Sequence, residues 1–164
     1  MNKENLNYHF EKSREYLNKA YQFQMKGQFE EAIINYKLSL DLHPSAEAHT
    51  FLGWTYSFLG DLDKAIDECK KAISLDPDFG NPYNDIGSYL IQKGEYDEAL
   101  TYLDLAIKAK KYDNHHFAHF NIGRVLEYKG LWFEALEEYK TAVRLSPDYL
   151  LAKQHFNKLQ GILN

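Results

Sequence analysis

Apolar residues recur along the chain at helical spacing, in stretches that short polar turns separate. Between Leu62 and Ile73 the apolar positions are 62, 65, 66, 69, 72 and 73, and the positions between them are charged. Gly60 precedes this stretch, where a helix can end in the left-handed conformation that glycine adopts at little cost. Asp76-Pro77 follows it, and a residue before proline avoids the helical region. The pattern predicts an amphipathic helix between Gly60 and Asp76.

A second helix is predicted directly before this one. Ser45 is a favourable N-cap residue, so we expect the helix to open there and to run to about Leu59. Two antiparallel helices with axes about 8–10 Å apart need a small side chain where they cross, and Gly53 supplies it. Residues 46–79 are therefore expected to form one helix-turn-helix unit.

The spacing of small residues indicates that this unit is repeated. Gly27, Gly60, Gly94 and Gly130 are separated by 33, 34 and 36 residues. Two further sets have the same steps: Ala20, Gly53, Gly87 and Gly123 in the first helix of each unit, and Ala32, Ala65, Ala99 and Ala135 in the second. Because no helix pair buries its apolar face alone, we expect the units to stack.

These steps divide the chain into one domain of four repeats with two ends. The repeats cover residues 13–45, 46–79, 80–113 and 116–149, with Asn114 and His115 inserted before the last one. Residues 1–12 are expected to extend the first helix backward or to fray. The third repeat has Lys111 where the other repeats have proline, so we expect its last turn to run on toward the insertion.

Residues 150–164 are expected to form a C-terminal capping helix, because a terminal repeat exposes a stacking face that needs a polar cover. Ser146-Pro147 is predicted to begin this helix, with proline at the first helical position. The predicted inner stripe is Leu151, His155, Phe156, Leu159, Ile162 and Leu163. Lys158 belongs to the side predicted to face water.

The order of small residue, glycine, alanine, aromatic or apolar residue, alanine and proline resembles the tetratricopeptide repeat. It is complete in Gly53, Tyr56, Gly60, Ala65, Cys69, Ala72 and Pro77, and nearly complete in Gly123, Leu126, Gly130, Ala135, Tyr139, Ala142 and Pro147. The resemblance covers about five-sixths of the chain. It implies an all-α fold, a right-handed α-α superhelix (a TPR solenoid) of four helix-turn-helix repeats plus a capping helix.

The resemblance also implies a binding surface. In this family the first helix of each repeat lines a concave groove, with ligand contacts at its second, fifth, sixth, ninth, twelfth and thirteenth places. The residues carried over to this chain as a peptide-binding groove are Asn18, Tyr21, Thr50, Phe51, Trp54, Phe58, Asn84, Ser88, Phe117, Phe120, Asn121, Arg124 and Tyr128. Trp54 is expected to be exposed and to matter most, because tryptophan is enriched at interface hot spots.

Some details of this groove stay open. Phe51, Phe58 and Phe120 either line it or pack between adjacent helices. The asparagines of the set are candidates for hydrogen bonds to the backbone of an extended peptide, since an amide both donates and accepts. Some family members hold the C-terminal carboxylate of heat-shock chaperones with cationic side chains at fixed places. Those places lack the cations here, so we do not expect a chaperone-tail adaptor.

Composition narrows the partners. The net charge is −5, and no run of Lys or Arg exceeds two residues, which argues against nucleic acid and against anionic membranes. No stretch of about 18 apolar residues is present, and the first residues lack the apolar core of a secretion signal. Cys69 is the only cysteine, so no internal disulfide is expected. The expected location is the cytoplasm.

Candidate chemistry is sparse. His115 and His119 have the i, i+4 spacing that can share a metal ion, but only Asp113 lies nearby to complete the set. No phosphate loop, catalytic triad or pair of catalytic carboxylates is recognisable, so no enzyme activity, metal or cofactor is predicted. The sequence predicts a non-catalytic scaffold or adaptor that binds a protein or peptide. The alternatives are a homo-oligomerising self-assembly module and a metal- or ligand-responsive regulator using the His115–His119 segment.

Overall fold

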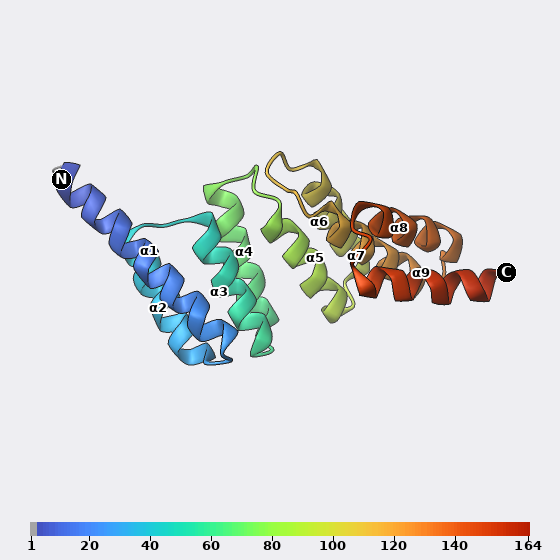
Figure 1. The fold of residues 1–164 in the computed structure, drawn as a ribbon, viewed down its shortest axis with the longest axis horizontal. Helices are drawn as coiled ribbons and strands as arrows, with labels where there is room; N and C mark the ends of the chain where they lie inside the picture. Colours follow the sequence, from blue (N-terminus) through green and yellow to red (C-terminus); the bar gives the residue numbers. More distant parts are fainter. Residues whose placement is uncertain (1–2) are drawn as a thin grey trace. The chain divides into compact units, whose positions relative to one another are not determined.

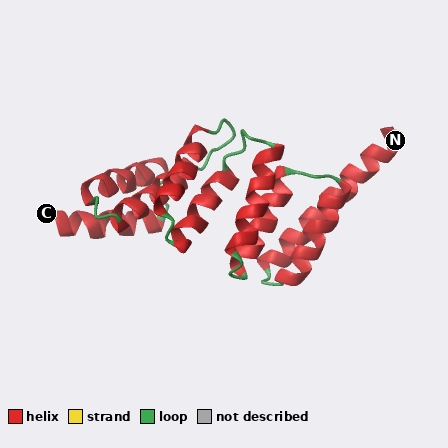
Figure 2. Ribbon diagram, turned by 180° about the vertical axis from the view of Figure 1, so that it is seen from behind, coloured by secondary structure: helices red, strands yellow, loops and turns green. Residues whose placement is uncertain are grey.

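The computed structural model describes residues 3–164, and over these residues it consists of nine α-helices without a β-strand. The helices are α1 (Lys3–Met25), α2 (Phe29–Leu42), α3 (Ala46–Phe58), α4 (Leu62–Leu75), α5 (Asn81–Lys93), α6 (Tyr96–Lys108), α7 (His115–Tyr128), α8 (Trp132–Leu145) and α9 (Leu150–Leu163). They follow one another along the chain in Figure 1 and are joined by the short loops drawn green in Figure 2. The all-α repeat fold predicted from the sequence is confirmed.

The chain divides into two compact units, Met1–Pro77 and Asp78–Asn164. In unit 1, α1 packs against α2, α3 against α4, and α2 against α3. In unit 2, α5 pairs with α6 and α7 with α8, while α6 also contacts α7 and α8 contacts α9 (Figure 1). Among the described residues, no helix combines the length and the apolar character that crossing a membrane requires.

The predicted helix ends and crossing points are present. Gly27, Gly60, Gly94 and Gly130 all adopt left-handed φ angles of 73–79°. The Ser45 side chain accepts a hydrogen bond from the Ala48 N–H at 3.2 Å, which confirms it as the cap of α3. A Cβ added to Gly123 would lie 2.6 Å from the Tyr139 ring, and one added to Gly53 would lie 2.9 Å from the Ala65 carbonyl oxygen. Glycine therefore permits the close approach of α3 to α4 and of α7 to α8.

The two ends of the chain differ partly from expectation. Helix α1 begins at Lys3, so residues 3–12 extend it backward, whereas Met1 and Asn2 lie outside the described residues. The prediction that α9 begins at Pro147 is wrong: the helix starts at Leu150, after a turn in which the Tyr149 N–H donates to the Ser146 carbonyl. The Tyr149 ring packs 5.1 Å from Phe117, which holds this turn against α7.

The predicted inner stripe of α9 is also partly wrong. Leu151 and Ile162 are more than half exposed, whereas Ala152 and Leu159 are buried against α8 together with the partly buried Phe156. Helix α9 is therefore rotated about its own axis, so that a face slightly different from the predicted stripe packs against α8. This rotation leaves Ile162 at the surface, where it is 58% exposed.

The third repeat ends earlier than predicted. Helix α6 stops at Lys108 and does not run on toward the insertion. Instead, the Lys111 N–H donates to the Asp78 carbonyl at 2.8 Å, and the Gly80 N–H donates to the Lys111 carbonyl at 3.1 Å. Tyr112, which is buried, packs so close to Gly80 that a Cβ there would lie 2.3 Å from it. These contacts between distant residues fix the loop before α7.

Candidate functional site

Four of the predicted groove residues come together in unit 1, on α1 and α3. The ring centroids of Tyr21 and Phe51 lie 5.5 Å apart, those of Phe51 and Trp54 6.4 Å, and those of Trp54 and Phe58 5.4 Å. Phe29 at the start of α2 adds a fifth ring, stacked 5.3 Å from Phe58. We call these five side chains the aromatic strip.

The aromatic strip is partly open to solvent. The exposed fraction is 41% for Tyr21, 37% for Trp54 and 53% for Phe58. Phe51 is half-buried, because it also packs 6.2 Å from the Tyr36 ring below the strip. Each exposed ring can bury further apolar surface against a partner.

Two predicted polar members of this surface behave differently. Asn18 on α1 is exposed, and its amide is accessible to a partner. Thr50 is buried, and its hydroxyl donates to the Ala46 carbonyl oxygen at 2.7 Å within α3. Thr50 is therefore not available to a partner, because it is buried and its hydroxyl already donates within its own helix.

The floor beneath the aromatic strip is closed and uncharged. The Tyr36 hydroxyl donates to Gln24 Oε1 at 2.6 Å, and the Thr55 hydroxyl donates to the same oxygen at 3.1 Å. Gln24, Tyr36 and Thr55 are all buried. Burial raises the pKa of Tyr36, so its hydroxyl stays a donor throughout the physiological range.

In unit 2 the predicted amides bond to one another. Asn121 Nδ2 donates to Asn84 Oδ1 at 3.1 Å, and Arg124 Nη1 donates to Asn121 Oδ1 at 3.2 Å. Asn121 is buried, and Ser88 is half-buried on α5. Beside them, burial raises the pKa of Asp85 to about 7, against a hydrogen bond from Asn84 that lowers it. The side chains that join α5 to α7 at this place are therefore polar, unlike the aromatic side chains of the strip in unit 1.

The three aromatic residues predicted on α7 separate in the structure. Phe120 is buried between Tyr139, Tyr149 and His155, so it packs between helices and does not line an open surface. Phe117 is exposed at 38%, and Tyr128 at 63% stacks 5.2 Å from Tyr96. The turn before α9 and α9 itself cover Phe120.

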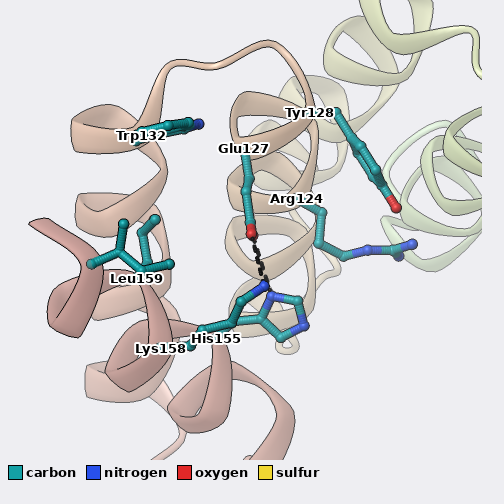
Figure 3. A pocket seen from close by; sticks show the side chains of 8 residues that line it. Arg124, Glu127, Tyr128, Trp132, His155, Lys158 and Leu159 are labelled. Carbon is teal, nitrogen blue, oxygen red and sulfur yellow. Dashed lines mark hydrogen bonds and ion pairs between the residues drawn. The ribbon is translucent and has the colours of Figure 1, made fainter.

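Unit 2 also contains a cavity of about 510 Å³ between α7, α8 and α9, which we call the C-terminal pocket. Side chains from all three helices converge on it in Figure 3. Its lining residues are Arg124, Glu127, Tyr128, Trp132, His155, Lys158, Leu159 and Ile162. The volume falls within the roughly 300–1,000 Å³ typical of ligand sites.

Glu127 is the only acidic group of the C-terminal pocket. The Tyr139 hydroxyl donates to Glu127 Oε2 at 2.7 Å, while His155 Nδ1 and Lys158 Nζ lie 3.4 and 3.5 Å from the carboxylate oxygens (Figure 3 marks the His155 contact). Burial acts to raise the pKa of Glu127, but these partners hold it below its ordinary value. The carboxylate is therefore ionised at neutral pH and bonded within the protein.

The sequence predicted Arg124 and Tyr128 at this place but missed the rest of the pocket. A signal was present. Counting from residue 150 as the start of a further first helix puts His155, Lys158 and Ile162 at the sixth, ninth and thirteenth places, which are groove places. Trp132 and Glu127 then complete the cavity from α8 and α7.

The histidine segment has separate neighbours. His119 Nδ1 lies 2.7 Å from Glu138 Oε2, just as His49 Nδ1 lies 2.6 Å from Glu68 Oε2 in unit 1. His116 packs against Phe117 and Tyr149. Within residues 3–164, no group of three His, Cys, Asp or Glu side chains is arranged to hold a metal ion.

Family models of the tetratricopeptide repeat match four segments of the chain, residues 16–44, 46–79, 68–101 and 116–149. The small glutamine-rich tetratricopeptide repeat-containing protein 2 of Mycosarcoma maydis is 34% identical over 70 residues. That match covers 42% of this chain and about a fifth, 20%, of the relative's length.

Solved structures share the fold. PilF of Pseudomonas aeruginosa superposes with a TM-score of 0.85 at 22% identity, over 92% of this chain and 68% of that one. The MamA protein superposes with a TM-score of 0.73 at 27% identity, over 91% of this chain and 81% of that one. Both likenesses extend over nearly the whole chain.

Proposed function

Because this chain belongs to the tetratricopeptide repeat family, we propose that it is a non-catalytic protein–protein interaction scaffold whose aromatic strip binds an apolar segment of a partner. The fold itself supports the scaffold role. The observation that carries the finer proposal is the continuous run of five rings on α1, α2 and α3, three of which remain more than a third exposed.

The chemistry of the aromatic strip defines the partner. Its five side chains carry no charge, and the groups beneath it are neutral and bonded to one another. A partner segment with two or three large apolar side chains would bury these rings, and burial of one such side chain contributes roughly 1.5–3 kcal/mol. Asn18 at the edge can hydrogen-bond the backbone of that segment. A highly charged segment would lose hydration without gaining partners.

The experiment is a selection of peptides from a random library on the purified chain, followed by affinity measurements with the selected peptides. We expect apolar and aromatic residues to be enriched. Trp54→Ala should weaken binding at least about tenfold, as is usual for a hot-spot tryptophan. Phe133→Ala is the matched control, because Phe133 is 70% exposed and lies on α8 outside both surfaces.

Two results would contradict the proposal. One is a selected peptide whose affinity is the same for wild type and Trp54→Ala. The other is a light-scattering mass that doubles with concentration and returns to the monomer value in Trp54→Ala. The second result would assign the aromatic strip to self-assembly instead.

A further inference from the structure

The C-terminal pocket has more hydrogen-bond donors than acceptors. Arg124 carries five N–H groups, of which one donates to Asn121, and Lys158 carries three on an ammonium group that approaches Glu127 to 3.5 Å. The one carboxylate, Glu127, already accepts the short bond from Tyr139. With two cations and one satisfied anion, the polar wall favours an acceptor group that carries negative charge.

The rest of the pocket is apolar. Tyr128 and Trp132 are 63% and 48% exposed, and Leu159 and Ile162 of α9 also line the pocket. Such exposed aromatic rings bind best to a large apolar group that covers them. The pocket therefore favours a ligand with two features, an anionic group within reach of Arg124 or Lys158 and an apolar group that covers the Trp132 ring.

We propose that the C-terminal pocket is a second binding site, and that it takes a peptide segment in which a large apolar side chain lies next to a carboxylate. A carboxylate matches the planar guanidinium of Arg124, which can donate two parallel N–H···O bonds. The carboxylate comes either from an Asp or Glu side chain or from the end of a chain. This site lies within unit 2 and is independent of the aromatic strip.

The test uses the full-length chain with Trp54→Phe, which leaves Trp132 as the single fluorescent indole. N-acetylphenylalanine carries an aromatic ring and a terminal carboxylate, and N-acetylphenylalaninamide is its neutral counterpart. N-acetyl-Phe-Asp-amide carries only a side-chain carboxylate. We expect the better anionic probe to change Trp132 emission with a dissociation constant of about 1 mM, and the neutral amide to bind about tenfold more weakly.

Variants locate the carboxylate. Arg124→Gln should weaken the anionic probe about tenfold and leave the neutral amide within a factor of two, and Lys158→Gln should do the same to a smaller extent. Lys153→Gln is the matched control, since Lys153 is an exposed lysine of α9 outside the pocket. Circular dichroism checks that Arg124→Gln keeps its helices. The exposed position of Lys158 makes Lys158→Gln the safer second variant.

The relative affinity of the two anionic probes identifies the source of the carboxylate. The proposal would be overturned if neither anionic probe bound more tightly than N-acetylphenylalaninamide, because the cations would then play no part. An anionic probe that binds Arg124→Gln and Lys158→Gln as tightly as the parent chain would overturn it too. Neither result would touch the aromatic strip, whose own test is Trp54→Ala.

Discussion

The aromatic strip and the C-terminal pocket lie at corresponding junctions, each formed by the two helices of one repeat and the helix that follows them. An offset of 103 residues relates α1 and α2 to α7 and α8, and an offset of 104 relates α3 to α9. By these offsets, Tyr21 corresponds to Arg124, and Phe51 and Trp54 correspond to His155 and Lys158. The same backbone junction is therefore lined by rings in unit 1 and by charges in unit 2.

The layer below the two surfaces is nearly identical. In unit 1 the buried Tyr36 donates to Gln24 at 2.6 Å, and in unit 2 the buried Tyr139 donates to Glu127 at 2.7 Å. The difference arises on two helices: α7 has Arg124 where α1 has Tyr21, and the covering helices α3 and α9 differ as well. Helix α3 contributes Phe51 and the hydroxyl of Thr55, which close the floor, whereas α9 contributes His155 and Lys158, which leave a cavity. The buried layer is thus kept, while side chains of α7 and of the covering helix α9 set the chemistry.

The largest expected effect tests whether a buried tyrosine stabilises both junctions to the same extent. Tyr36→Ala and Tyr139→Ala should each lower the free energy of unfolding by about 3–5 kcal/mol, because each removes a fully buried ring. Urea unfolding followed by circular dichroism measures this. Tyr128→Ala, at 63% exposure, is the control and should cost well under about 1 kcal/mol. A loss in only one of the two junctions would break the comparison.

The next prediction tests whether the side chains at the corresponding places decide by themselves which ligand each junction binds. Arg124→Tyr combined with Lys158→Trp gives the C-terminal pocket the residues found at the corresponding places of the aromatic strip. The preference for N-acetylphenylalanine over its amide should fall from about tenfold to near one, a change of about 1.4 kcal/mol. Trp132 fluorescence is not usable in this variant, so calorimetric titration measures it. A preference that survives both substitutions would place the anion elsewhere.

A smaller effect separates Glu127 from its neutral counterpart Gln24. The pKa of Glu127 is lowered in the folded state, so its stabilising contribution is present above the ordinary carboxyl range and is lost as the pH falls through the lowered value. Glu127→Gln should therefore cost about 1 kcal/mol or less at pH 7 and less than that at pH 3. Unfolding by urea at both pH values measures the difference. Gln24 has no titratable group, so Gln24→Asn should not change the pH dependence of unfolding. If Glu127→Gln unfolds with the same pH dependence as the parent chain, the stabilising role assigned to the Glu127 carboxylate is contradicted.

The sequence predicted the part of this structure that depends on local spacing. Glycine and alanine at fixed steps located the helix crossings, because only small residues fit where two helices approach closely. At Gly123 even a Cβ would lie 2.6 Å from the Tyr139 ring. The left-handed glycines located the helix ends, because their positive φ angles are costly for other residues.

What could not be predicted depends on contacts between distant residues. Helical spacing puts Phe120 on the groove face of α7, but only the positions of Tyr149 and α9 show that this ring is covered. The loop before α7 depends on Lys111 pairing with Asp78 and Gly80, which no local pattern specifies. The sequence predicts α9 as a solvating cap and therefore does not predict the pocket, although the repeat register continues into this helix.

The smallest expected effect is the change in stability on Lys158→Gln, and its smallness is what makes it useful. Lys158 is 65% exposed and approaches Glu127 only to 3.5 Å, so water screens the pair and its loss should change the free energy of unfolding by about 0.5 kcal/mol or less. The same substitution should weaken the anionic probe several-fold, since the bound carboxylate would lose a donor. Urea unfolding and calorimetric titration of one preparation measure both quantities. Lys153→Gln should change neither. If Lys158→Gln instead lowers stability as much as Glu127→Gln does, Lys158 serves the fold of the α7–α9 junction, and the contrast with Trp54 in the aromatic strip would lose its functional meaning.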